Sequence, residues 1–497
     1  MNNKETLLGI RRGIEKESLR AMPGGGLALT PHPIALGSAL THPHITTDFS
    51  ESQVELITGV HAGVEDCLRE LTEIHQATYR ALADERLWVS SMPCGLPTDE
   101  TIPLGRYGSS NVGRAKSIYR MGLGQRYGRR MQTISGIHYN WSLPGVSTDG
   151  YFGAIRNFRR EGWLLLYLFG ASPALCDSFV AGREHGLQRL SDHSLYLPHA
   201  TSLRMGRLGY QSDAQSSIAV TYNCLESYAA SLQEALSRPY PAYEAIGVQT
   251  PGGDYNQLST SLLQIENEFY STIRAKRVIR SGERPLHALR ERGVEYIEVR
   301  LMDLDPFEPV GIGADAIRVL DAFLLHCLHS ESPKDTPDEI AANARNQHRV
   351  AARGREPGLK LEHWQGGERS LQAWAGEILA GCAAHAEALD AAHGGNAYRS
   401  ALRRVAERLQ RPELCPSARV LSVMDQDFDD SHVGFIRRQS DATRAQLLAL
   451  PFSEALQQRF EKMATDSLAE QARIEAADTL DFEAFRRFYV APERMAV

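Results

Sequence analysis

Several segments that are far apart in this chain alternate like β-strands and carry acidic residues on one face. This pattern constrains the possible folds more than any other feature of the sequence. In GIEKESLR, Glu15 and Glu17 share one face of a strand with Lys16 on the other, and their Cα atoms would lie about 6.6 Å apart. In EYIEVRLMDLDPF, Glu298 and Arg300 share a face opposite isoleucine, valine and leucine. A solvated strand edge explains the first pattern without a function, and a cross-strand ion pair explains the second. Both segments are predicted to be strands.

The order of such elements predicts an antiparallel sheet. Up to about residue 330, strand-like and helical patterns do not alternate in the regular manner of βαβ units, which favours an α+β fold. From about residue 335 alanine, leucine, arginine and glutamate recur at helical spacing, so the last third is predicted to be mainly helical. We therefore expect a sheet core at 1–330 that carries the chemistry, a loop at 330–340, and a mainly helical region at 331–497 packed on the core.

TTDFSESQVELITGV, residues 46–60, is predicted to enter a helix. Ser50 can cap that helix, whose apolar positions would face the core. Glu51 and Glu55 would then lie four residues apart on one side, with Asp48 just before the first turn, where its charge suits the helix dipole. Capping and surface acids explain the same pattern without a function.

MQTISGIHYNWSLP, residues 131–144, alternates as a strand with His138 and Asn140 on one face. A lone histidine is more often a packed or surface residue than a ligand. Combined with the carboxylates of the other segments, however, one imidazole suits a hard divalent cation such as Mg²⁺, which takes oxygen ligands and binds phosphates. The residue types therefore favour a magnesium and phosphate site over thiolate-rich zinc chemistry.

Composition and missing motifs narrow the possible functions. The chain has 497 residues, a net charge of −7 and seven scattered cysteines, which argues against nonspecific nucleic-acid binding and fits a reducing compartment. The N-terminus lacks the apolar stretch of a signal peptide, and the most apolar segment, WLLLYLFGASPALC, is shorter than a bilayer span. Walker, H-E-x-x-H and G-x-S-x-G motifs are absent from the sequence. We expect a cytoplasmic protein that binds neither nucleic acid nor membrane.

Seven blocks of the sequence together resemble the glutamate–cysteine ligases of the proteobacterial type, the γ-glutamylcysteine synthetases of glutathione biosynthesis. They run in order from about residue 10 to 312: RGIEKESLR, ALGSALTHPHITTDFSESQVELIT, MQTISGIHYNWSLP, YLFGASPALCDSF, ATSLRMGRLGYQS, LLQIENEFYSTIRAKR and GVEYIEVRLMDLDPF. The resemblance implies a glutamine-synthetase-like fold, whose curved antiparallel sheet forms a funnel around ATP and metal ions. Lys16 and Ser18 stand where arginine and threonine are common in the family, and Trp141 where phenylalanine is common.

The resemblance also implies roles for matching positions. Arg300 matches the arginine near the transferred phosphate and, with Glu298, is expected to be catalytic. The implied metal ligands are Glu15, Glu17, Asp48, Glu55, His138 and Glu298. The implied cysteine-binding residues are Leu123, Gln132, Ile134, Arg204, Tyr210 and Tyr270. Glutamate is expected to contact Thr133, Asn140 and Arg300, and ATP is expected to contact Arg300 and Lys276.

The activity implied by the resemblance is an ATP-dependent ligation. The γ-carboxylate of L-glutamate would take the γ-phosphate of ATP, and the amine of L-cysteine would then displace phosphate from the γ-glutamyl phosphate. Two or more Mg²⁺ ions, replaceable by Mn²⁺, are expected as cofactors, and glutathione is expected as a feedback inhibitor. The alternative is a related carboxylate–amine ligase that joins glutamate to a different amine. A catalytically dead relative is disfavoured because the implied metal ligands are all present.

Overall fold

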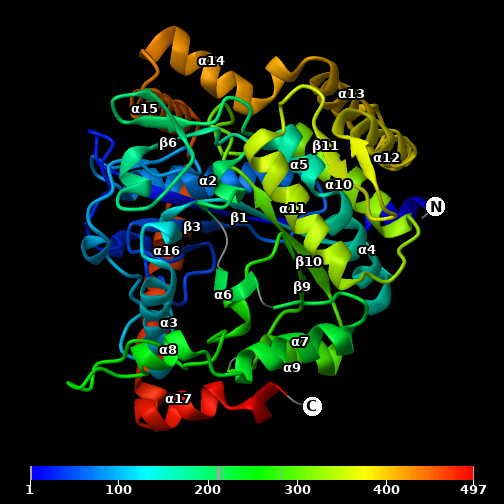
Figure 1. Cartoon of the computed structure of the whole chain (residues 1–497). Helices are drawn as coiled ribbons and strands as arrows, with labels where there is room; N and C mark the ends of the chain where they lie inside the picture. The colour runs from blue at the N-terminus through cyan, green and yellow to red at the C-terminus, as the bar shows by residue number, and fades with distance from the viewer. Residues whose placement is uncertain (1–2, 210–212, 217, 281, 496–497) are drawn as a thin grey trace.

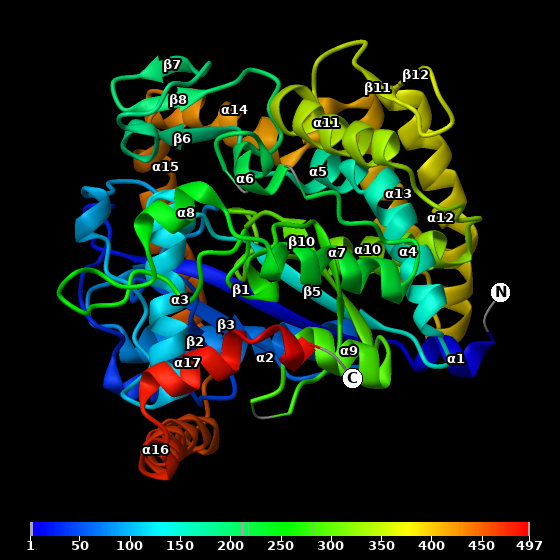
Figure 2. The ribbon, with the colours of Figure 1, turned by 60° about the horizontal axis from the view of Figure 1, so that its bottom comes forward.

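A computed structural model describes residues 3–209, 213–216, 218–280 and 282–495. At its centre lies an antiparallel sheet of seven strands in the order β2-β3-β1-β5-β10-β9, with the short β4 paired to β1 (Figures 1 and 2). Its strands are β1 (Arg11–Ala21), β2 (Ile45–Thr47), β3 (Gln53–Ile57), β4 (Arg86–Leu87), β5 (Ile137–Ser142), β9 (Ile273–Lys276) and β10 (Tyr296–Met302). Two smaller sheets comprise β6 (Ala174–Cys176), β7 (Gln188–Ser191) and β8 (Ser194–Tyr196), and β11 (Lys360–Glu362) with β12 (Glu368–Ser370).

Helices cover one face of the central sheet and extend outward from it. Those of the N-terminal region are α1 (Lys4–Leu8), α2 (Val64–Ala81), α3 (Asn111–Tyr127), α4 (Thr148–Glu161), α5 (Trp163–Phe169), α6 (Asp213–Ser216), α7 (Leu225–Ser237), α8 (Pro241–Ile246), α9 (Pro285–Arg292) and α10 (Ala314–His329). The C-terminal region adds α11 (Pro337–Arg353), α12 (Leu371–His393), α13 (Ala397–Gln410), α14 (Pro416–Phe428), α15 (His432–Ala449), α16 (Glu454–Ala477) and α17 (Phe482–Val490). Contacts of α2 with β1 and β3, and of α5 with β10, fix this layer against the sheet.

The strands predicted from the two-residue period are confirmed. In β10, Ile297 and Val299 are fully buried against the helical layer, while Glu298 and Arg300 lie on the opposite face and line a cavity. A register shift between Val299 and Met302 in the pairing with β5 marks a β-bulge. The sheet therefore has one covered face and one face that is open to a cavity.

The helix predicted within residues 46–60 is wrong, because this segment forms the hairpin β2–β3. Val54 and Leu56 are fully buried whereas Glu55 lines the cavity, so the segment follows the strand period. Pairing with β1 on one side and β2 on the other supplies the backbone hydrogen bonds that a helix would have made internally. Ser50 is not a helix cap, since its hydroxyl donates to the Pro103 carbonyl at 2.5 Å.

The helical C-terminal region is confirmed, and its side chains join the same hydrophobic core as the sheet. Leu389 of α12 and Val405 of α13 belong to one buried cluster with Ile14 and Val299. The apolar segment predicted to be core is α5, in which every residue is buried. Within the described residues no helix is both long and apolar enough to cross a membrane, and all seven cysteines are free thiols.

Candidate active site

A cavity of about 590 Å³ opens on the uncovered face of the sheet. Its walls come from β1, β3, β5, β9 and β10, from α3, from the loop at 258–270 and from α17 near the end of the chain. Carboxylates project from the strands, basic side chains come from α3, β9 and β10, and apolar side chains that pack with α17 also line the cavity. Segments that are separated by hundreds of residues thus meet around one volume.

Antiparallel register brings the acids together. Glu15 of β1 lies opposite His138 of β5, and Glu17 lies opposite Glu55 of β3. Two carboxylates directly opposite each other on one face repel. Burial, and then the charge of Asp48, raise the pKa of Glu17 to about 7, and burial with the charges of Glu15 and Asp48 raises the pKa of Glu55 well above its usual range. This cluster needs added positive charge before it can ionise fully.

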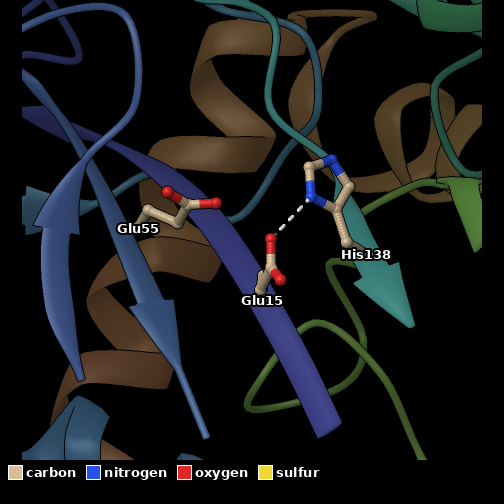
Figure 3. Close-up of side chains that lie close together, drawn as sticks. All are labelled: Glu15, Glu55 and His138. Carbon is tan, nitrogen blue, oxygen red and sulfur yellow. Dashed lines mark hydrogen bonds and ion pairs between the residues drawn. The ribbon is translucent and has the colours of Figure 1, made fainter. Parts of the chain in front are cut away.

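His138 lies close to three of the acids, and Figure 3 shows its bond to Glu15 with Glu55 on the far side of Glu15. Its Nδ1 is 3.1 Å from Glu15 Oε2 and 3.7 Å from Glu298 Oε1, and its Nε2 is 3.6 Å from Glu17 Oε1. Burial opposes ionisation of Glu15, but the hydrogen bond with His138, together with the charges of His138 and Lys276, lowers the pKa of that carboxyl. Asn140 Nδ2 donates to Glu15 Oε1 at 2.9 Å and so fixes the carboxylate in place.

Basic groups meet the cluster at Glu298. Lys276 Nζ lies 3.4 Å from Glu298 Oε1, and Arg300 Nη1 lies 3.1 Å from Oε2. Burial opposes ionisation here too, yet the charges of Lys276 and Arg300 hold the pKa of Glu298 well below its usual range. A permanently charged carboxylate beside two cations offers both a metal ligand and binding groups for a phosphate.

Two overlapping trios could hold metal ions. The potential ligand atoms of Glu15, Glu55 and His138 lie within 4.8 Å of one another, and so do those of Glu17, Asp48 and Glu55. In addition, the buried Oε2 of Glu298 has Arg300 Nη1 at 3.1 Å, but no contact to it within the described residues has hydrogen-bond geometry, so this oxygen could also contact a bound cation. Carboxylate oxygens with a single imidazole fit Mg²⁺ or Mn²⁺.

Five residues implied as a cysteine pocket line the same cavity: Leu123, Gln132, Ile134, Arg204 and Tyr270. Gln132 Nε2 donates to the Tyr270 hydroxyl at 2.7 Å, which joins two walls of the pocket. Arg204 is buried, and its Nε donates to Asp303 Oδ1 at 2.9 Å, so the guanidinium has a fixed orientation. Tyr210, the sixth residue of this set, lies outside the described residues.

Some predicted residues lie apart from the cavity wall. Thr133 is fully buried, and its hydroxyl donates to the Arg130 carbonyl at 2.7 Å. Asn140 reaches the site through its bond to Glu15. Glu51 is buried elsewhere, where its carboxylate accepts backbone N–H groups of His32 and Arg106 at 2.8 and 2.6 Å.

The structure also adds residues that were not predicted as site residues. Lys116 and Arg120 on α3 and Arg274 on β9 line the cavity, and Phe485 and Tyr489 of α17 close its apolar end. The basic run IRAKRVIR contains Arg274 and is a visible signal in the sequence. No comparable signal marks the residues of α3 and α17, because their place in the cavity depends on how distant segments pack.

Comparisons with known proteins identify the relatives of this chain. The family model for glutamate–cysteine ligase matches residues 1–350. A glutamate–cysteine ligase of Alcanivorax borkumensis is 49% identical, with 97% of this chain and 96% of that protein covered. One of Pseudomonas aeruginosa is 48% identical, with 96% and 94% covered.

Solved structures extend the similarity to three dimensions. The crystal structure of a glutamate–cysteine ligase from Francisella tularensis in complex with AMP matches with a TM-score of 0.93 at 35% identity, over 98% of this chain and 99% of that chain. A bifunctional glutathione synthetase from Pasteurella multocida shares the fold, with a TM-score of 0.73 at 24% identity over 93% of this chain and 57% of that one. The predicted glutamine-synthetase-like fold, with its antiparallel sheet and helical C-terminal region, is confirmed.

Proposed function

The chain belongs to the glutamate–cysteine ligase family, and we propose that the cavity on the open face of its sheet is where the ligation takes place. The protein joins the γ-carboxylate of L-glutamate to the amine of L-cysteine and converts ATP to ADP and phosphate, the first step of glutathione biosynthesis. The observation that supports the location is the convergence of two ligand trios with Lys276 and Arg300 in one cavity.

Activation of glutamate needs charge neutralisation. An oxygen of its γ-carboxylate attacks the γ-phosphorus of ATP, the bond to the ADP oxygen breaks, and γ-glutamyl phosphate forms. Arg300 and Lys276, held beside Glu298, are placed to attract the oxygens of the transferred phosphoryl group. We assign Glu15, Glu17, Asp48, Glu55, His138 and Glu298 as ligands of Mg²⁺. When bound, such ions neutralise the charge that develops on phosphate oxygens.

Cysteine then attacks the activated carbonyl. Its amine nitrogen forms the new C–N bond, phosphate leaves with the electrons of the broken C–O bond, and the amine loses a proton. The fixed guanidinium of Arg204 suits the cysteine carboxylate, while Leu123 and Ile134 offer apolar contacts to the thiol side chain. Because the sheet core carries these groups, we assign the chemistry to residues 1–330 and a supporting role to the helices of 331–497.

A product assay tests this function. Purified protein with L-glutamate, L-cysteine, ATP and Mg²⁺ should form γ-glutamylcysteine and ADP in equal amounts, and omission of any one component should stop both. Product formed only with another amine would support the related ligase instead. We also propose that glutathione, which contains the γ-glutamylcysteine unit, inhibits by competing with glutamate, so that added glutamate should restore the rate.

A further inference from the structure

The last described residues of the chain cross the mouth of the cavity. We call residues 482–495 the C-terminal strap; it comprises α17 and the short 3₁₀ helix Pro492–Met495. In Figure 2 α17 runs from α3 toward α9. Residues 1–350, which the family model matches, do not include this segment. Its role in the reaction therefore has to be argued from its contacts.

Specific contacts anchor the strap at both ends. Near its start, the Arg114 guanidinium of α3 lies 4.3 Å from the centre of the Phe482 ring, and Arg486 Nη1 donates to the Leu258 carbonyl at 2.6 Å. Near its end, Arg290 Nη1 donates to the carbonyl of the fully buried Met495 at 2.6 Å. The strap is thus tied to α3, to the 258–270 loop and to α9.

Two rings of the strap face the cavity. Phe485 and Tyr489, one helical turn apart, both line it and lie nearly parallel, with ring centres 5.7 Å apart and planes 10° apart. Arg284 Nη1 donates to the Tyr489 carbonyl at 2.5 Å and holds this part of the helix in place. Ile279 and Val112 line the same end, and their side chains remain 48% and 37% exposed.

Next to the strap, Leu258 and Ile265 pack in one apolar cluster with the two rings, although Arg280 and Glu266 line the cavity as well. Exposed apolar groups in a cavity favour a ligand with a matching apolar surface. Glutamate and cysteine are small and mostly polar, whereas the nucleotide carries charge at one end and a flat aromatic base at the other. One segment of the chain lines the cavity from the acid cluster to the strap. It contributes Lys276 at the acid cluster, then Arg280, and then Pro285 next to the strap.

We propose that the C-terminal strap forms the base-binding end of the nucleotide site, with Phe485 and Tyr489 contacting the purine and ribose of ATP. This inference rests on the proposed function, because it takes the acid cluster as the place of the triphosphate. The strap then selects a triphosphate that carries a base over one that does not.

Binding measurements with two probes separate a base contact from general damage to the cavity. Titration calorimetry of the full chain with Mg²⁺ and ATP should show that Phe485→Ala raises the ATP dissociation constant about tenfold, as expected when a base loses an aromatic contact. Binding of inorganic tripolyphosphate, which has no base, should be unchanged. Phe488→Ala is a matched control, because Phe488 lies on the same helix but is 51% exposed and contacts Arg494.

The outcomes are distinct. Unchanged ATP binding in Phe485→Ala, or equal loss of ATP and tripolyphosphate binding, would overturn the proposal. If the alanine variant does not fold, Phe485→Leu keeps an apolar side chain without the ring and should weaken ATP binding by a smaller factor, with the KM of glutamate and of cysteine within twofold of wild type. Wild-type protein that binds ATP but makes no γ-glutamylcysteine would refute the proposed function and leave the strap measurement valid.

Discussion

The two faces of the central sheet differ in how their charged side chains are paired. On the covered face, Arg12 of β1 donates to Asp321 of α10 at 2.9 Å, and both side chains are fully buried. The Tyr139 hydroxyl donates to the same carboxylate at 2.7 Å. Lys16 on this face meets the imidazole of His75 at 2.8 Å, and burial lowers the pKa of this lysine to about 7. Charge on the covered face is either paired or easily neutralised.

On the cavity face of the same strands, carboxylates lie directly opposite each other, as Glu17 of β1 does against Glu55 of β3. Glu15 and Glu17 alternate with Arg12 and Lys16 along β1, so both faces are made by one stretch of sequence. A fold that needed only stability would pair these acids or replace them. The difference is that opposite charges are paired on the covered face, whereas like charges meet on the face that we propose as the cation site.

The largest expected effect is on catalysis at the cavity face. Glu298→Gln should lower kcat/KM about a thousandfold, because it removes the charge that we assign to metal binding and that orients Lys276 and Arg300. The variant should still fold, because Lys276 and Arg300 remain partly exposed to the cavity. The matched control is Glu295→Gln, a half-exposed glutamate just before the same strand, which should retain activity in the coupled ADP assay. Near-wild-type turnover by Glu298→Gln would contradict the assignment of Glu298 as a metal ligand.

The next effect is on stability at the covered face. Asp321→Asn should lower the free energy of unfolding by about 3–4 kcal/mol in urea titrations, because it leaves the buried Arg12 without its counter-charge. KM values of the folded fraction should stay the same. Asp315→Asn on the same helix weakens a pair with the exposed Arg404 and a 3.9 Å pair with Arg318, and should cost under about 1 kcal/mol. Equal costs for the two variants would contradict the contrast between the faces.

Sequence patterns predicted the strands that carry residues of both faces, but not every element that pairs or packs with those strands. Strand parity identified the face of Glu15, His138 and Glu298 because side-chain direction in a strand is a local property. The helix expected around Glu55 was wrong because pairing with β1 and β2, a tertiary effect, overrode the local capping signal at Ser50. The assigned metal roles remain predictions that binding experiments must test.

A third prediction concerns metal. At a concentration about a hundredfold above its dissociation constant, Mg²⁺ should stabilise the fold by about 2.7 kcal/mol, as measured by urea unfolding against EDTA. Glu55→Gln should lose most of this gain, since Glu55 belongs to both ligand trios. Glu65→Gln, at a largely exposed site on α2, should keep the full gain. Equal responses of the two variants would exclude Glu55 as a ligand.

The smallest predicted effect is a pH dependence without metal. The pKa of Glu17 is about 7 in the folded protein against 4.5 for an ordinary glutamate, so the folded state retains a proton that the unfolded state has released between these values. Stability therefore falls as pH rises from 4.5 through 7, by about 2.6 kcal/mol for this residue. The difference in unfolding free energy between wild type and Glu17→Gln in EDTA should show this slope. A flat difference would mean that Glu17 is already ionised at low pH.

The residues of α3 and α17 show where sequence reasoning reaches its limit. Lys116 and Phe485 lie in segments with ordinary helical patterns, and only the packing of the chain places them beside the acids. Helical periodicity identifies a buried face but not what that face is buried against. Local sequence patterns therefore identified the acidic residues of the cavity, whereas the residues that α3 and α17 contribute could be identified only from the structure.

The cavity is walled by β1 at one end of the chain and by α17 at the other. During synthesis, the N-terminal part of a polypeptide folds before the rest emerges from the ribosome. When β10 has emerged, every strand of the central sheet has been made, yet the whole helical C-terminal region is still to be translated. A nascent chain can thus bring its acids together early and complete the cavity wall only after α17 has been translated, so a message cut before α17 yields a protein whose cavity lacks this wall.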